Sequence, residues 1–227
     1  METFQRFEKK YLLNDEQYAS LMEQMKEHIV PDKFYQTMIR SLYYDTDDHE
    51  LVRRSIEKPE YKEKLRARSY GDSKGNDEVF VELKKKYDGI VYKRRTQVCC
   101  KDVLNDITTC HFKDSQVGKE ILYALNYYGK LSPSIYIGCK RTSYVGKKEE
   151  DLRITFDKEI SYRTRNLSLQ KDDDDDRPLT DKTVMELKIK DAMPLWLADI
   201  LDENKVYPQS YSKVGNAFLK QLQGEML

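Results

Sequence analysis

Cationic side chains recur at every second position along several segments of this chain, a spacing that places them on one face of a β-strand. The longest such run contains Lys62, Lys64, Arg66 and Arg68. Arginine offers a bidentate fork to phosphate oxygens, and lysine offers a point charge. A strand face built from these residues could therefore bind an anion that carries several phosphates.

The same alternation appears in other segments, where glutamates join the lysines. The aligned residues are Glu8 with Lys10, Glu82 with Lys84 and Lys86, Lys93 with Arg95, Glu186 with Lys188 and Lys190, and single arginines at Arg141 and Arg153. An ordinary half-exposed antiparallel sheet would explain any one of these strands. The repetition of Glu-x-Lys favours instead one shared charged face, on which glutamates could bind a divalent cation that bridges to phosphate.

The elements that must position these residues follow from hydrophobic periodicity. Period-two patterns predict eight strands, at about 4–13, 37–44, 61–70, 78–87, 90–98, 135–144, 152–162 and 183–190. Helical spacing predicts helices from about residue 14 until Pro31 ends the first one, and then at 117–128, 194–201 and 214–222. A short helix is expected within 45–59, and the five aspartates of 172–176 are expected to form a solvated loop. We predict a single α+β domain over residues 1–227.

The helices present apolar faces that need a surface to pack on, and the apolar sides of the strands supply one. We therefore predict an eight-stranded antiparallel β-barrel with helices packed outside and a charged interior. Such an interior must be wet and must hold counter-charge, because uncompensated buried cations are costly.

Composition excludes several classes of protein. The 227 residues contain 40 Lys plus Arg and 40 Asp plus Glu, so the formal net charge is zero and bulk attraction to nucleic acid is not expected. The four cysteines lack Cys-x-x-Cys spacing, and no glycine-rich nucleotide loop or Ser-His-Asp pattern is present. No apolar run is long enough for a transmembrane helix, and the first residues lack a signal sequence, so a cytoplasmic location is expected.

Nine stretches together resemble a known family. They are Arg6–Tyr11, Ile39–Asp45, Lys64–Tyr70, Val81–Lys86, Lys93–Arg95, Arg141–Tyr144, Leu152–Asp157, Met185–Lys188 and Ser212–Lys213. In this order they resemble the VTC domain, the polyphosphate polymerase domain of the triphosphate tunnel metalloenzyme (CYTH-like) superfamily, in its stand-alone bacterial form. The resemblance implies a tunnel in which the γ-phosphoryl of ATP is transferred to a growing polyphosphate chain, with Mn²⁺ or Mg²⁺.

The resemblance also implies roles for individual residues. It assigns nucleotide and polyphosphate binding to Lys10, Arg66, Arg68, Lys84, Lys93, Arg141 and Arg153, metal binding to Glu186, and a role in activity to Lys213. As a mechanistic hypothesis we further expect catalytic roles for Arg66, Arg68 and Glu186 together with Lys213, phosphate binding by Lys188 and Ser212, and support of the metal by Glu8 or Glu82. Some relatives carry a further lysine two positions before the serine, where this chain has Ser210.

Three alternatives remain open at this stage. The first is a hydrolase of tripolyphosphate or nucleoside triphosphates in the same superfamily, and the second is a module that binds polyphosphate or nucleotides without turnover. A nucleic-acid binder is the least favoured, since no recognition motif is present. Arg40 and Asp45 fit a structural ion pair as well as a site. The primer and any membrane partner that receives product are not specified by the sequence.

Overall fold

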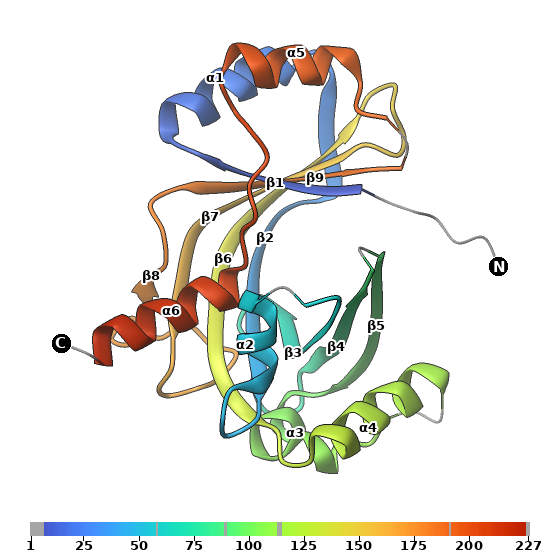
Figure 1. The fold of residues 1–227 in the computed structure, drawn as a ribbon, viewed down its shortest axis with the longest axis vertical. Coiled ribbons are helices and arrows are strands. Elements are labelled where there is room, and N and C mark those ends of the chain that lie inside the picture. Colours follow the sequence, from blue (N-terminus) through green and yellow to red (C-terminus); the bar gives the residue numbers. More distant parts are fainter. Residues whose placement is uncertain (1–6, 58, 89, 113–114, 191, 226–227) are drawn as a thin grey trace. The chain divides into compact units, whose positions relative to one another are not determined.

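The computed structural model describes residues 7–225 except 58, 89, 113–114 and 191. Its elements are β1 (Phe7–Leu13), α1 (Asp15–Met25), β2 (Ile29–Asp45), α2 (Glu50–Glu57), β3 (Tyr61–Tyr70), β4 (Glu78–Tyr87), β5 (Ile90–Cys99), α3 (Cys100–Asn105), η1 (Ile107–Thr109), α4 (Gln116–Tyr128), β6 (Ser132–Gly146), β7 (Arg153–Arg163), β8 (Arg177–Pro178), β9 (Thr183–Ile189), α5 (Leu195–Glu203) and α6 (Lys213–Glu225) (Figure 1). All eight predicted strands are present, and β8 is an additional short one.

The strands form one antiparallel sheet in an α+β chain. Its hydrogen-bonded order is β1-β9-β7-β6-β2-β3-β4-β5, and β8 pairs with β7. This order begins at β1 and ends at β5 without returning to its start, so within the described residues the sheet is open. The fold class is confirmed, whereas the closed eight-stranded barrel is not.

The chain divides into two compact units, each assembled from separate segments. Unit 1 comprises residues up to 38, 139–160 and 180–211, and unit 2 comprises 39–138, 161–179 and the residues from 212 onward. Strands β2, β6 and β7 contribute to both units. The prediction of a single domain over the whole chain stays a prediction.

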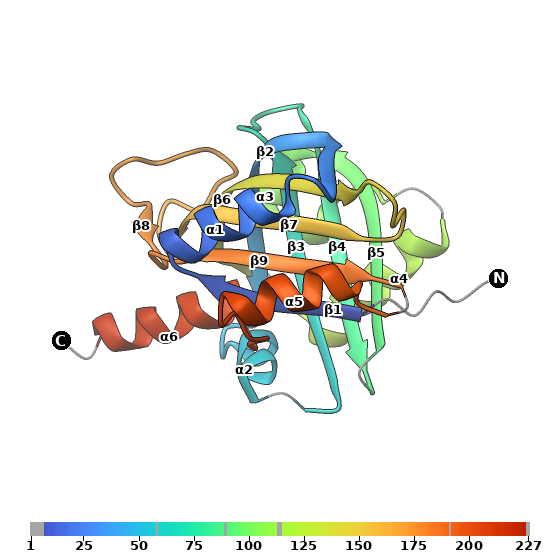
Figure 2. The same ribbon diagram turned by 90° about the horizontal axis from the view of Figure 1, so that it is seen from above.

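In unit 1, α1 and α5 lie side by side over one face of the strands (Figure 2). Leu21 and Met25 of α1 and Leu197 of α5 pack with Phe156 and Leu187 of the sheet, and all five are buried. Helix α1 begins where predicted because Asn14 and Gln17 form a reciprocal capping box. These helices cover the apolar side of β7 and β9 and leave the charged side uncovered by them.

In unit 2, α3 and α4 pack on the apolar side of the β3-β4-β5 sheet (Figure 1). Leu65, Val81 and Leu83 of the strands meet Val103 of α3 and Ile121 of α4 in a buried cluster. The alternation that buries these residues turns the cationic residues of the same strands to the opposite face.

Two local predictions are wrong. Pro31 does not end a helix but lies near the start of β2. Only residues 39–44 of β2 pair with β3, so the missing N–H of Pro31 costs no hydrogen bond to β3. Helix α3 was not expected, because six residues are too few to show a helical period. Among the described residues, no helix has the length and apolar character needed to cross a membrane.

Candidate functional site: two cationic faces held by buried glutamates

The cationic face of unit 2 is set by the register of three strands. Successive cross-strand rows from β3, β4 and β5 are Lys64, Lys84 and Lys93, then Arg66, Glu82 and Arg95. Residues in one row point to the same side, about 5 Å from their neighbours. The face is strongly basic, and Glu82 is the acidic member of these rows.

Glu82 is the counter-ion at the centre of this face. Arg66 Nε donates to Glu82 Oε2 at 2.8 Å, Arg68 Nη1 lies 3.7 Å from the same oxygen, and Lys93 Nζ lies 2.7 Å from Oε1. The Glu82 side chain is 1% exposed, while those of Arg66 and Arg68 are 17% and 11% exposed. Burial alone would raise the pKa of Glu82, but the three cations hold it well below its usual range. The Arg66/Arg68 face therefore does not point to bulk solvent, as the sequence interpretation required.

Lys93 is the cation of this cluster with the most easily removed proton. Burial, together with the charges of Arg66 and Arg68, lowers its pKa to about 8 despite the attraction of Glu82. Its ammonium group thus changes charge within an accessible pH range, which arginine cannot do.

Tyr43 of β2 belongs to the site although it was not among the predicted site residues. Arg66 Nη1 donates to Tyr43 Oη at 2.8 Å, and the two residues are cross-strand partners. Burial would raise the pKa of Tyr43, but Arg66, Lys64 and Arg68 outweigh that effect and lower it to about 8. Tyr43 lies within Ile39–Asp45, one of the stretches that resemble the family, but only the β2–β3 register places it beside Arg66.

The start of α6 lies beside this face. Lys64 Nζ donates to Ser212 Oγ at 2.9 Å, and the same oxygen accepts from Gly215 N at 3.2 Å. Lys213, the first residue of α6, is thereby placed close to β3 by its neighbour. The structure thus brings Ser212, and with it the start of α6 at Lys213, to the strand that carries Arg66, and adds Lys64 to the set.

Unit 1 carries a second charged face on β1 and β9. Lys10 pairs across the strands with Glu186, and Glu8 pairs with Lys188. Lys188 Nζ lies 2.9 Å from Glu186 Oε1, Lys10 Nζ lies 3.5 Å from Oε2, and Lys10 also contacts Glu8. Burial would raise the pKa of Glu186, but Lys188, Lys10 and Arg141 hold it well below its usual range.

The two predicted arginines of unit 1, Arg141 and Arg153, differ in solvent exposure and in the ion pairs that they form. Arg141 makes a bidentate pair with Asp157, whose carboxylate oxygens accept from Nε at 2.6 Å and from Nη2 at 2.7 Å. Arg153 Nη2 lies 2.5 Å from Asp32 Oδ2, and its side chain is 47% exposed. Arg153 therefore has a solvated ion pair, whereas Arg141 is partly buried and its counter-ion Asp157 is fully buried.

The carboxylates can be tested as ligands for a divalent cation. Glu8 and Glu186 flank Lys10 on one face and supply the oxygen donors that Mg²⁺ and Mn²⁺ prefer, so they fit such an ion. Glu186 also faces three cations, but Glu8 contacts Lys10 and Asp157 pairs with Arg141, so further carboxylates share that positive charge. Glu82 does not fit, because it is the one carboxylate in its cross-strand rows and faces three cations. Within the described residues, no cluster of three or more potential ligands has the geometry of a ready metal site.

Arg40 and Asp45 do not pair with each other as proposed. Arg40 Nη1 donates to Tyr136 Oη at 2.6 Å, and its Nε lies 2.7 Å from Asp72. The Asp45 carboxylate instead accepts from the backbone N–H groups of Leu51 and Val52 at 2.8 and 2.9 Å, which caps α2. Both residues are structural.

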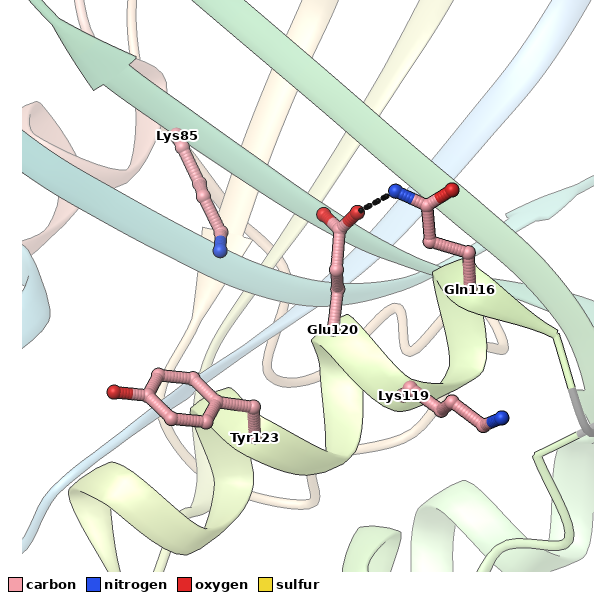
Figure 3. Close-up of a pocket in the computed structure, with 5 residues that line it drawn as sticks. All are labelled: Lys85, Gln116, Lys119, Glu120 and Tyr123. Atoms are coloured by element: carbon pink, nitrogen blue, oxygen red, sulfur yellow. Dashed lines mark hydrogen bonds between the residues drawn. The ribbon is translucent and has the colours of Figure 1, made fainter.

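A pocket of about 390 Å³ lies between β4 and α4, on the face of the unit 2 sheet opposite Glu82 (Figure 3). Lys85 points into it from β4, and Glu120 accepts from Gln116 at 3.2 Å on its helical wall. Glu120 also pairs with Arg94, so Lys85 and Arg94 lie opposite the Glu82 face, as their place in the alternation predicted.

The antiparallel sheet and its two charged faces define a protein in which lysine and arginine side chains on the strands are paired with buried glutamates. A model of the VTC domain matches residues 5–220, so the chain belongs to the VTC domain family. No curated protein sequence gives a significant match.

Several solved structures are similar to this chain at low sequence identity, and the first shows that the fold is shared. A candidate adenylate cyclase from Bacillus halodurans matches with a TM-score of 0.55 and 14% identity over 90% of this chain and 92% of that one. The PH1819 protein of Pyrococcus horikoshii gives a TM-score of 0.48 with 14% identity, covering 95% and 99% of the two chains. A candidate adenylate cyclase from Vibrio parahaemolyticus gives 0.49 with 10% identity, covering 96% and 99%.

Proposed function

We propose that this chain is an ATP-dependent polyphosphate polymerase of the triphosphate tunnel type, which transfers the γ-phosphoryl of ATP to a growing polyphosphate chain. The observation that carries the proposal is the Glu82 cluster, in which three cations converge on one buried carboxylate. Such a cluster has more positive than negative charge, and its carboxylate is shielded from water while Lys93 remains partly exposed. A linear anion with several phosphates supplies the missing negative charge.

Phosphoryl transfer depends on alignment and charge neutralisation more than on covalent chemistry by the protein. Arg66 and Arg68 are held by Glu82 and by cross-strand contacts, so their forks are positioned before the substrate arrives. They would bind the β- and γ-phosphates together with Lys84 and Lys93. Ser212 and Lys213 would hold a phosphate next to Lys64.

Unit 1 would bind phosphate through groups of its own, namely Lys10, Arg141, Arg153 and Lys188. Glu186, supported by Glu8, would hold a divalent cation, Mn²⁺ or Mg²⁺. When bound, that ion would neutralise negative charge on phosphate oxygens. Lys10 and Lys188 would turn from Glu186 to the bound anion, which would leave the Glu186 carboxylate available to the cation.

The test is to incubate the protein with ATP and Mn²⁺ and resolve the products by length on a gel. Chains longer than the substrate support a polymerase, whereas free phosphate released from tripolyphosphate without longer chains supports a hydrolase. Tight binding of tripolyphosphate with neither product supports a binding module.

Arg66→Ala is expected to lower activity by roughly 10²–10³-fold, since it removes a preorganised cation from the transition state. Arg94→Ala is the matched control, because Arg94 lies on the opposite face of the same sheet and pairs with Glu120. Equal activity of Arg66→Ala, Glu186→Ala and the parent would show that the site is elsewhere.

A further inference from the structure

Thr155 lies in the centre of the charged face of unit 1. Strand β9 runs between β1 and β7, so Glu186 has Lys10 as its partner on one side and Thr155 on the other. The neighbouring row contains Glu8, Lys188 and Arg153 in the same order. Directly opposed residues in antiparallel strands have Cβ atoms about 5 Å apart, which is within reach for a glutamate side chain.

The Thr155 hydroxyl is buried and has no hydrogen-bond partner among the described residues. The side chain can donate one hydrogen bond and accept two. A buried hydroxyl without a partner loses its bonds to water and destabilises the structure. The unpaired Thr155 hydroxyl therefore lowers the stability of the free protein. Its position beside a carboxylate points to a hydrogen bond that forms in a ligand-bound state.

Glu186 is the natural partner in that other state. In the free protein its two carboxylate oxygens face Lys188 and Lys10, at 2.9 and 3.5 Å. An anion that draws these lysines away would leave Glu186, whose side chain is only 11% exposed, with Arg141 alone of its three cations, and Arg141 is already paired with Asp157. A change of rotamer toward β7 would then bring the carboxylate to the Thr155 hydroxyl.

We propose that Thr155 is a positioning residue, whose hydroxyl donates a hydrogen bond to Glu186 once a polyphosphate has taken Lys10 and Lys188. The donor fixes the orientation of the carboxylate and keeps it ionised, ready to face a divalent cation. The inference rests on the proposed function, since it requires that the unit 1 face bind a polyphosphate.

The test uses tripolyphosphate as ligand, with binding measured by calorimetry and the melting temperature measured with and without ligand. Thr155→Val keeps the shape of the side chain and removes the hydroxyl. We expect the free protein to be as stable as the parent or slightly more so. We expect the affinity for tripolyphosphate to fall about tenfold, the scale of one hydrogen bond to a charged group. Thr155→Ser retains the donor and is expected to bind within about twofold of the parent.

Thr183→Val is the matched control, because Thr183 is a buried threonine of β9 on the opposite side of the strand from Glu186. It is expected to leave tripolyphosphate affinity unchanged. In a Glu186→Gln background, Thr155→Val is expected to cause little further loss, since the charged acceptor is gone.

Three results would overturn the inference, and they are distinguishable. If the parent binds tripolyphosphate and Thr155→Val binds it equally well, the positioning role is wrong and the proposed function stands. If Thr155→Val lowers the stability of the free protein as much as that of the complex, the hydroxyl is structural. If the parent does not bind tripolyphosphate, the proposed function fails and this inference fails with it.

Discussion

Glu82 and Glu186 each hold several cations in place on their own unit. Glu82 faces Arg66, Arg68 and Lys93, and it is nearly inaccessible to water. A single carboxylate cannot neutralise three positive charges, so it stabilises the cluster while leaving a net attraction for anions. Glu82 thus permits the free protein to fold around a face that is prepared for an anionic ligand.

Replacing Glu82 by Gln is expected to have opposite effects on folding and binding. The substitution removes the buried carboxylate that pairs with Arg66 and Arg68, so the free energy of unfolding should fall by about 3–5 kcal/mol. Affinity for tripolyphosphate should rise, because a competing negative charge is removed. Urea unfolding with and without tripolyphosphate measures both effects. As a control, Glu120→Gln breaks a half-exposed ion pair and should lower the free energy of unfolding by about 0–1 kcal/mol. If Glu82→Gln lowered the free energy of unfolding by no more than this, Glu82 would not be a buried counter-ion.

The pKa values of Lys93 and Tyr43, both about 8, predict that anion binding weakens in mild alkali. As pH rises from 7 to 9, Lys93 loses its positive charge and Tyr43 gains a negative one, so the affinity for tripolyphosphate should fall. Both pKa values lie below those of the unfolded chain. The unfolded state therefore binds more protons between about pH 8 and 10, and these groups should make the free protein more stable as pH rises through that window.

Calorimetry across this pH range measures the affinity, and Lys93→Arg is the control because its guanidinium keeps its proton. Tyr43→Phe removes the second titrating group while preserving the ring. A pH profile that is as steep in the Lys93→Arg and Tyr43→Phe double variant as in the parent would rule out these two groups as its source.

At the scale of elements, one arginine organises the segment that follows β7. Arg163 is buried, its Nη2 donates to the carbonyls of Ser168 and Gln170 at 3.1 and 2.9 Å, and its Nη1 lies 2.5 Å from Asp176. The guanidinium also lies 3.8 Å from the ring centre of Tyr136. The aspartate run at 172–176, expected to be a solvated loop, is therefore tied at its last residue to the interior of unit 2.

Arg163→Ala is expected to lower the free energy of unfolding by about 3–5 kcal/mol, because it leaves Asp176 and several carbonyls without their buried donor. Arg163→Lys keeps the charge but cannot reach all of these acceptors, so it should lie between Ala and the parent. Urea unfolding gives the magnitude, and limited proteolysis should show earlier cleavage within residues 164–176. Lys140→Ala breaks an exposed pair with Glu159 and should change stability by about 0–1 kcal/mol; proteolysis that is equally slow in Arg163→Ala would contradict the role.

At the scale of the whole molecule, the balance of 40 basic against 40 acidic residues conceals a sorting of charge. Basic residues outnumber carboxylates on the strand faces around Glu82 and Glu186, while other charges pair at the surface and carboxylates such as Asp45 cap helices. A net charge of zero gives no general attraction for polyanions. Binding must therefore come from an anion that contacts the clusters directly.

This sorting predicts discrimination between polyanions of equal charge. A linear polyphosphate can bring one phosphate to each successive cation, whereas single-stranded DNA carries bases and sugars between its charges. We expect a short single-stranded DNA matched in charge to bind at least about tenfold more weakly than polyphosphate at 50 mM salt, since only local contacts operate. Competition binding measures the ratio. Equal affinities would mean that the clusters respond to charge alone.

Much of the fold could be predicted because its signals are local. The eight strands follow from period-two patterns, and the hairpin between β4 and β5 follows from a two-residue turn signal. Helix α3 was missed because it is short, and the strand position of Pro31 depends on which partner lies beside β2. Closure of the sheet was inferred from packing needs, and the strand order, which ends at β1 and β5, does not confirm it.

The sequence by itself determined which residues share a face, because side chains alternate along any extended strand whatever its neighbours. It thereby identified Arg66, Arg68 and Glu82 as one set. Only the tertiary structure decided how each charge is paired, because register and strand order bring Tyr43 to Arg66 and Thr155 to Glu186 from distant parts of the chain. Such pairings depend on hydrogen bonding between strands, and no local period in the sequence encodes them.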